Sequence, residues 1–267
     1  MIKDITIGQY YPGDSPLHRM DPRMKIVVAM VFIVAIFLVK TWWGYLAVLL
    51  FFLLALFVSR LPVKFMLKSV KPLLFIIILT FVLNLFLSPE GNALFQWGFL
   101  RVTDRGLEMA AMLSLRLIFL VLSASLLTLT TSPIALTDGI ERLLSPLKVI
   151  HFPAHELAMM MTIALRFIPT LLEETDKIMK AQMARGADFE SGNILRRAKA
   201  MVPLLVPLFV SAFRRADELA MAMEARCYKG GSGRTRMKVL HLARRDYIAL
   251  AAVAVLVALL VLERVFL

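Results

Sequence analysis

The sequence predicts an all-α integral membrane protein with about five transmembrane helices and a cytoplasmic or interfacial domain of amphipathic helices before the last of them. Of the 267 residues, 60% are hydrophobic, and the mean hydropathy of +0.77 is too high for an ordinary soluble domain. The apolar residues form separate runs close to the length of about 20 residues that a spanning helix needs. The Lys and Arg residues, which give a net charge of +12, are shared unevenly between the connecting segments.

Five apolar runs are candidate transmembrane helices. They are Ile26–Val39, Thr41–Ser59, Pro72–Pro89, Met109–Thr131 and Tyr247–Leu262. The first and last are short, so we expect flanking residues to complete them, with basic side chains at their ends reaching the interface. Asn84 and Arg116 lie inside the third and fourth runs and need partners there. Arg116 is expected to have a structural use or one related to transport, and the sequence leaves both open.

The basic residues predict that the N-terminus is cytoplasmic and the C-terminus outside. The N-terminal segment, the loop 60–71 after the second run and residues 131–245 together carry 26 of the 31 Lys and Arg residues. The first 25 residues lack the apolar core of a signal peptide. The single Cys227 excludes an internal disulfide and fits a reducing compartment. Because the positive charge follows the predicted topology, we expect a bilayer as partner and no nucleic acid.

The predicted organisation has three parts. Residues 1–131 form an N-terminal cytoplasmic segment and the first four spans, residues 132–245 form the coupling-helix domain, and residues 246–267 form the last span. Within the middle part we expect a short amphipathic helix at Ile134–Leu144 and two long helices at about Ala154–Ala187 and Ile194–Tyr228, separated by a turn at residues 190–193.

Both long helices change from apolar to charged partway along. Each has about twelve apolar residues, too few to cross a bilayer, so we expect an interfacial or protein-buried position. Pro169, Pro203 and Pro207 are expected to bend them. Half of the sixteen methionines lie on these helices, where they fill a core or form an adaptable surface for several partners.

The two long helices end in the same way. Ala184-Arg185-Gly186 and Ala225-Arg226-Cys227 lie 41 positions apart and share the pattern Ala-Arg-small. A lone arginine at a helix end usually compensates the helix dipole. Small neighbours in both copies favour a second interpretation, in which each guanidinium enters a groove on a partner and binds a carboxylate there. Two copies then suggest two grooves, and so a dimeric or pseudo-dimeric partner.

Other kinds of site are not supported by their residues. The glycine-rich segment 229–234 lacks the spacing of a phosphate loop and follows a helix, so we expect a flexible connector. His151, His155 and Glu156 do not have the spacing of a metal site, because Pro153 interrupts the helix between the two histidines. No catalytic arrangement of side chains is evident either. We therefore expect a chain that is not an enzyme and holds no cofactor or metal of its own.

The chain resembles the transmembrane T component of energy-coupling factor transporters, the EcfT/CbiQ family, over essentially its whole length. The opening stretch from Gly8 to Lys25 is similar to the start of the family, and the two triplets are similar to its pair of Ala-Arg-Gly motifs. Cys227 stands where glycine is commoner, while Arg226 is intact.

This resemblance implies a scaffold in the plasma membrane of a prokaryote. Two cytoplasmic ABC-type ATPases, which bind ATP and Mg²⁺, and a small membrane S component, which captures a vitamin or metal ion, would be its partners. The triplets at Arg185 and Arg226 would insert into grooves on the two ATPases. The alternatives are a membrane enzyme acting on lipid-like substrates through Arg116 and His151, for which no cavity-facing nucleophile is evident, and a stand-alone carrier, for which the spans lack polar or broken segments.

Overall fold

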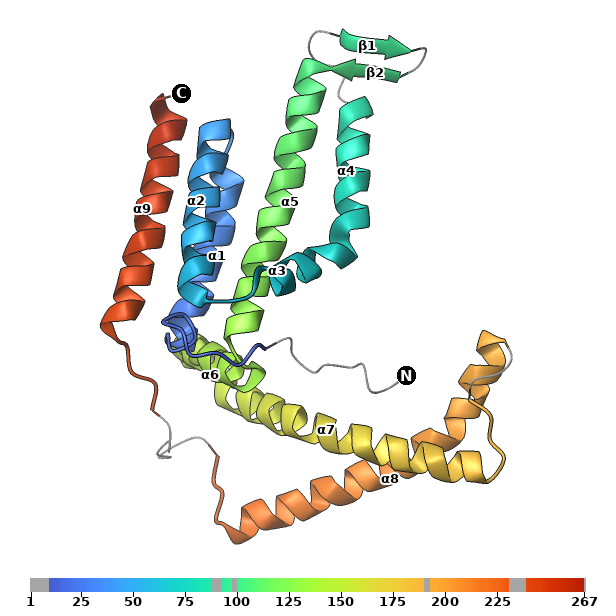
Figure 1. Ribbon diagram of the computed structural model, residues 1–267. Helices are drawn as coiled ribbons and strands as arrows, with labels where there is room; N and C mark the ends of the chain where they lie inside the picture. Colours follow the sequence, from blue (N-terminus) through green and yellow to red (C-terminus); the bar gives the residue numbers. More distant parts are fainter. Residues whose placement is uncertain (1–9, 88–92, 98–99, 190–192, 231–238, 267) are drawn as a thin grey trace. The chain divides into compact units, whose positions relative to one another are not determined.

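The computed structural model describes residues 10–87, 93–97, 100–189, 193–230 and 239–266 (Figure 1). The chain divides into two compact units. One consists of Gly8–Arg142 with Val239–Leu267 and holds the predicted spans, and we call it the membrane unit. The other consists of Met1–Ile7 with Leu143–Lys238 and holds the two long helices, and we call it the paired-helix unit.

Helices make up almost all of the membrane unit. They are α1 (Pro22–Leu38), α2 (Trp42–Ser59), α3 (Val63–Val70), the 3-10 turn η2 (Lys71–Leu73), α4 (Leu74–Leu87), α5 (Asp104–Thr130), α6 (Pro133–Leu144) and α9 (Arg244–Phe266). Helix α1 packs against both α5 and α9, α2 contacts the same two helices, and α4 packs along α5. Figure 1 shows α1, α2, α5 and α9 running side by side as a bundle.

Polar side chains define where the spans begin. Asp21 precedes α1 and accepts a hydrogen bond from the backbone N–H of Arg23, with Pro22 at the first helical position. Thr41 and Thr103 precede α2 and α5, and each hydroxyl accepts a hydrogen bond from the backbone N–H of the third helical residue. These side chains satisfy backbone donors that have no partner inside the helix. The short polar segments between apolar runs therefore set the helix starts.

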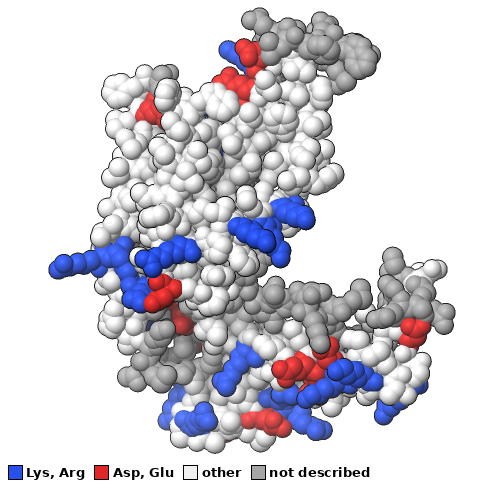
Figure 2. Space-filling view, in the orientation of Figure 1, with Lys and Arg blue, Asp and Glu red and all other residues white. Residues whose placement is uncertain are grey.

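A packed core joins the spans, while most of their surface is apolar and exposed. Ile36 and Val48 are fully buried in the core, and the rings of Phe32 and Phe51 stack with centroids 5.2 Å apart. On the outside, Trp43 and Phe57 are 72% and 85% exposed. Figure 2 shows a broad uncharged face over the spans, with Lys and Arg gathered toward the end where α3 lies. An apolar exterior with charges at the end of the helices suits a bundle surrounded by lipid.

The fold class is confirmed, although the helices that qualify as spans differ from the predicted set. Among the described residues, five helices are long and apolar enough to cross a membrane. They are Trp42–Ser59, Val63–Phe86, Asp104–Thr130, Ala154–Ala184 and Arg244–Phe266. Helix α1 has 17 residues and lies at the lower limit of a span. The helix Ala154–Ala184 qualifies with a mean hydropathy of 1.2, against 2.1 or more for the other four, because only its first part is apolar. Its interfacial position stays a prediction.

The segment between the second and third predicted spans was interpreted wrongly as a loop. Residues 63–70 form α3, an amphipathic helix whose Met66 is buried, and η2 leads from it directly into α4. A two-stranded antiparallel hairpin, β1 (Ala93–Trp97) and β2 (Leu100–Thr103), was also missed, and it pairs Gln96 with Arg101. Strands this short carry little periodicity by which sequence could identify them.

The paired-helix unit follows the predicted pattern closely. It contains the 3-10 helix η3 (Ser145–Ile150), α7 (Ala154–Ala184) and α8 (Ile194–Ala225). Pro169 lies inside α7, and both helices continue through their prolines. Each helix ends three residues earlier than predicted, at the Ala of its triplet. Of the predicted turn at 190–193, only Asn193, which precedes α8, lies within the described residues.

Candidate partner-docking site

The two long helices cross at equivalent positions of the sequence repeat. Nη2 of Arg215 on α8 donates a hydrogen bond of 3.0 Å to Oε2 of Glu174 on α7, and the two residues are 41 positions apart. The offset between Arg185 and Arg226 is also 41. Positions that correspond in the repeat therefore contact each other, as expected where an approximate two-fold axis passes through a pair of helices.

This crossing places the two triplets symmetrically. Each arginine lies eleven residues beyond its crossing residue, which is about 16 Å along an α-helix at 1.5 Å per residue. Figure 1 shows the C-terminal ends of α7 and α8 at opposite ends of the pair. The two arginines are therefore at most about 33 Å apart along the helix axes, twice the length of one arm.

The backbone of the first triplet closes α7 with a Schellman motif. The N–H of Ala187 donates to the carbonyl of Gln182 at 3.0 Å, and the N–H of Gly186 donates to the carbonyl of Met183 at 2.9 Å. Gly186 has a φ of +90°, in the left-handed region. These are the two hydrogen bonds that define the motif, and its residue of positive φ is usually glycine.

The second triplet repeats this geometry at the end of α8. The N–H of Tyr228 donates to the carbonyl of Met223 at 3.0 Å, and the N–H of Cys227 donates to the carbonyl of Glu224 at 2.8 Å. Cys227 has a φ of +56°. Cys227, which stands where glycine is commoner, therefore has the same left-handed conformation as Gly186, at a conformational cost that glycine would not incur.

The small third residue thus has a local explanation that the sequence did not reveal. A Cβ added at Gly186 would meet nothing within 4 Å inside the chain, so internal packing does not require glycine there. The positive φ does favour it. This finding does not remove the second interpretation, since a small side chain at an open position also leaves room for a partner.

All six residues of the triplets are exposed. Within the described residues, the guanidinium groups of Arg185 and Arg226 take part in no hydrogen bond or ion pair with other side chains. Unpaired guanidinium groups on closed helix ends can accept a carboxylate in a bidentate arrangement. The chemistry available at these ends is therefore recognition of an acidic group, twice, in the same local geometry.

Arg116 and Asn84, the two polar residues singled out inside the predicted spans, each donate a hydrogen bond within the chain. Nη2 of Arg116 donates to the carbonyl of Val39 at 3.2 Å, just past the end of α1, and its guanidinium lies 5.6 Å from the ring centre of Phe37. Nδ2 of Asn84 donates to the carbonyl of Thr80 at 2.8 Å, one turn back on α4. These contacts favour the structural use of Arg116, because a cation near a helix C-terminus compensates its exposed carbonyls.

The segment before α1 is hydrogen-bonded to the ends of other helices. The N–H of Tyr11 donates to the carbonyl of Leu129, and Nζ of Lys25 donates to the carbonyl of Thr130, at 2.9 Å each. Asp246 near the start of α9 is fully buried and accepts the N–H of Asp21 at 2.9 Å and that of Ala243 at 2.7 Å. One carboxylate therefore satisfies the residues that precede both α1 and α9, a contact that sequence analysis missed.

The ion pair of Asp21 with Arg23 determines the electrostatics just before α1. Asp21 accepts from the side chain and the backbone N–H of Arg23. Burial alone would raise the pKa of Asp21, but the hydrogen bonds from Arg23 outweigh it and hold the pKa below its ordinary value of 3.8.

As for a metal, the described residues contain no group of three His, Cys, Asp or Glu side chains that could hold one.

Comparisons with known proteins agree on one family. A family model described as "Cobalt transport protein", CbiQ, matches residues 13–238. The chain is 58% identical over 267 residues to the energy-coupling factor transporter transmembrane protein EcfT of Clostridium kluyveri, covering all of this chain and 99% of the relative. Proteins of the same name from Ruminiclostridium cellulolyticum and Bacillus subtilis are 56% and 50% identical, over 100% and 97% of this chain and 100% and 98% of the relatives.

Proposed function

This chain belongs to the CbiQ family, a family of transporter membrane components, and we propose that it is the transmembrane coupling subunit of an energy-coupling factor importer. The resemblance seen in the sequence is thereby confirmed at the level of the family. The family and the apolar helices support a multi-pass membrane protein that takes part in transport. The partners, the orientation and the coupling role belong to the proposal.

The pair of equivalent helix ends carries this proposal. Arg185 and Arg226 each lie in a Schellman motif with the same hydrogen-bond pattern, at the same distance along the helix from the Glu174–Arg215 contact. Neither guanidinium has a partner among the described residues. An approximately two-fold pair of cationic ends fits a partner with two equivalent acidic grooves. We propose that two ABC-type ATPases supply these grooves, one for Ala184-Arg185-Gly186 and one for Ala225-Arg226-Cys227.

The remaining parts of the proposal follow from this docking. The ATPases bind ATP and Mg²⁺, so this chain needs no cofactor and performs no catalysis itself. An S component in the membrane binds the vitamin or metal ion. Residues 132–245 form the coupling domain on the cytoplasmic side, between the spans of residues 1–131 and the last span in residues 246–267. The N-terminus lies in the cytoplasm and the C-terminus outside, in the plasma membrane of a prokaryote.

Co-purification with the ATPases tests the docking. If each guanidinium binds a buried carboxylate, truncating it strands that carboxylate at a cost of about 2–5 kcal/mol, or roughly 30- to 3000-fold in affinity at that groove. One intact groove can hold the complex together through effective concentration, so we expect single Arg→Ala variants to assemble and transport poorly. The double variant Arg185→Glu/Arg226→Glu is expected to release both ATPases.

Exposed lysines on the same helices provide matched controls. Lys180 on α7 and Lys199 on α8 are exposed, and their replacement by Glu is expected to change ATPase binding by no more than about 1 kcal/mol. Substrate uptake is measured in the same strains. A double Arg→Glu variant that co-purifies with the ATPases and transports like the parent refutes the docking.

A further inference from the structure

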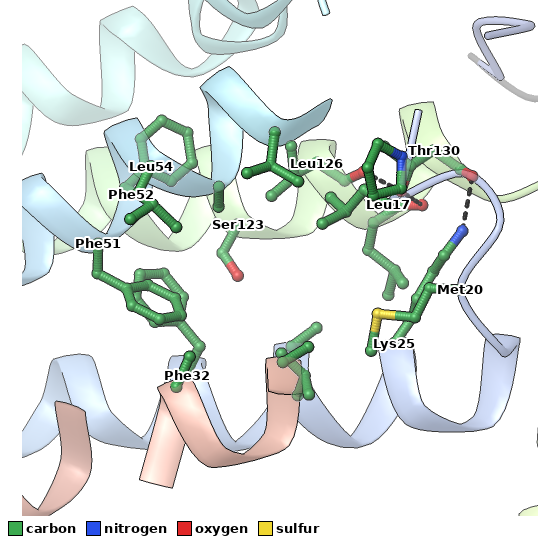
Figure 3. Close-up of a pocket in the computed structure, with 18 of the residues that line it drawn as sticks. Leu17, Met20, Lys25, Phe32, Phe51, Phe52, Leu54, Ser123, Leu126 and Thr130 are labelled. Carbon is green, nitrogen blue, oxygen red and sulfur yellow. Dashed lines mark hydrogen bonds between the residues drawn. The ribbon is translucent and has the colours of Figure 1, made fainter. Parts of the chain in front are cut away.

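A cavity of about 340 Å³ lies inside the membrane unit (Figure 3). Its walls come from α1, α2, α5 and α9, and Pro16, Leu17 and Met20 of the segment before α1 complete it. This volume falls in the range of about 300–1,000 Å³ typical of ligand pockets. Because helices of the predicted spans form its walls, we expect the hydrocarbon of the bilayer rather than water at its mouth.

The two ends of the cavity differ in chemistry. One end is aromatic, with Phe32 stacked on Phe51. The other is cationic, since Lys25 and Arg245 line it. Figure 3 shows Lys25 far from Phe51, with its amino group turned to Thr130 and the apolar side chains between them. The cavity therefore changes from apolar to basic along its length.

The charge at the basic end is not balanced by the residues around it. Nζ of Lys25 donates to three neutral oxygens, the carbonyls of His18 and Thr130 and the hydroxyl of Thr131. Asp246 and Asp21 are the nearby acids: both oxygens of Asp246 already accept backbone N–H groups, and Asp21 is paired with Arg23. Arg245 is exposed and forms no ion pair with the described residues. Counting the described residues alone, one uncompensated positive charge thus remains where the cavity meets the helix ends.

We propose that this cavity holds an acyl chain of an anionic phospholipid, whose phosphate binds Arg245. The apolar lining offers a water molecule almost none of the two to four polar partners it needs, whereas it matches a hydrocarbon chain. Arg245 presents a planar fork of donors that suits a phosphate. Lys25 adds its charge to that end without leaving its own partners. This lipid site is independent of the ATPase docking proposed above.

The proposal is tested on the full-length chain, purified in a non-ionic detergent, by native mass spectrometry. The chain is titrated with phosphatidylglycerol and, separately, with phosphatidylcholine carrying the same acyl chains. Tighter binding of phosphatidylglycerol is expected, by about fivefold, the factor that one basic side chain contributes near an anionic surface. The variant Arg245→Gln should lose that preference, because a neutral amide does not distinguish the anionic headgroup of phosphatidylglycerol from the zwitterionic headgroup of phosphatidylcholine. Inorganic phosphate in excess should displace neither lipid, because it has no acyl chain.

Two matched variants separate this site from general effects. Ala252 lines the cavity and Ala254, two residues on, is exposed on the outside of α9. The variant Ala252→Phe should weaken binding of both lipids at least tenfold, and Ala254→Phe should leave it unchanged. Likewise, Arg244→Gln should keep the preference that Arg245→Gln loses. Ala249→Leu, which fills the same cavity with a smaller side chain, is used if circular dichroism shows that Ala252→Phe is unfolded.

Three results would overturn the proposal. Equal binding of the two lipids would remove the role of the basic end. Unchanged binding in the cavity-filling variant would place the lipid elsewhere on the surface. Equal losses in Arg244→Gln and Arg245→Gln would show a diffuse attraction between the basic helix end and the lipid rather than a site.

Discussion

Replacing Asp246 with asparagine is expected to destabilise the membrane unit by about 1.5–3 kcal/mol. The Asp246 carboxylate is fully buried, and its two oxygens accept the N–H of Asp21 and the N–H of Ala243. The asparagine amide has one oxygen that can still accept one of these N–H groups. Its NH2 group faces the other N–H, so that donor is left without an acceptor. Losing one hydrogen bond to a charged group costs about 1.5–3 kcal/mol. Asp246→Ala removes both hydrogen bonds and leaves two buried backbone N–H donors without an acceptor, so it should cost about 3–6 kcal/mol, twice the value for one bond.

The assay is the unfolding of the full chain from detergent micelles by sodium dodecyl sulfate, followed by circular dichroism. Asp104 is the matched control, since it is an exposed acid in the first turn of another span, α5. Its replacement by asparagine should cost no more than about 1 kcal/mol, the value of a charge interacting with a helix dipole. If Asp246→Asn unfolds at the same detergent concentration as the parent, the carboxylate does not join α1 to α9 and the reasoning is refuted.

Further predictions concern the helix ends and the segment before α1. Cys227→Gly should stabilise the end of α8 by up to about 1 kcal/mol, and Gly186→Ala should destabilise α7 by about 1–2 kcal/mol, because both positions have positive φ; hydrogen exchange of the terminal amides measures both, and equal exchange in all variants would contradict it. Cys227 should react with an impermeant thiol reagent in inside-out vesicles and be shielded when the ATPases are present, whereas labelling of intact cells would refute the orientation. The purified chain should not bind ATP, and stoichiometric binding in detergent would overturn the scaffold role. Burial, with the Lys25 cation nearby, holds the pKa of His18 below 6.5. As the pH drops through 6.5 the unfolded chain takes up the proton first, so the stability of the folded chain should fall. His18→Gln should not show this fall.

The regular features of the fold were predictable because their signals are local. Apolar runs located the helices α1, α2, α4, α5 and α9, and the change from apolar to charged residues located α7 and α8 to within three residues at their C-terminal ends. The triplets were recognised as a repeated pattern for the same reason. The short helix α3 and the β1–β2 hairpin were not found, since a few residues carry too little periodicity to separate them from a loop.

The sequence suggested the residues of the candidate site, whose docking role stays a prediction, but it did not indicate their geometry. Arg185 and Arg226 were chosen from sequence, while the Schellman motifs that explain Gly186 and Cys227 depend on backbone conformation. The pairing of Glu174 with Arg215 could have been suspected from their shared offset of 41, which the sequence already contained. Their contact nevertheless required the two helices to cross at that position.

By itself, the sequence determined the membrane class, the family and the two arginine-bearing helix ends, because hydropathy, charge distribution and short motifs can be read along the chain. Only the tertiary structure decided that Asp246 accepts the N–H of Asp21, 225 positions away, that Arg116 reaches the end of α1, and that an apolar cavity with a basic end lies among four helices. The physical reason is that burial and partnership depend on packing between distant segments. A charged residue in the sequence shows that a partner is needed, and the packed structure determines which one it has.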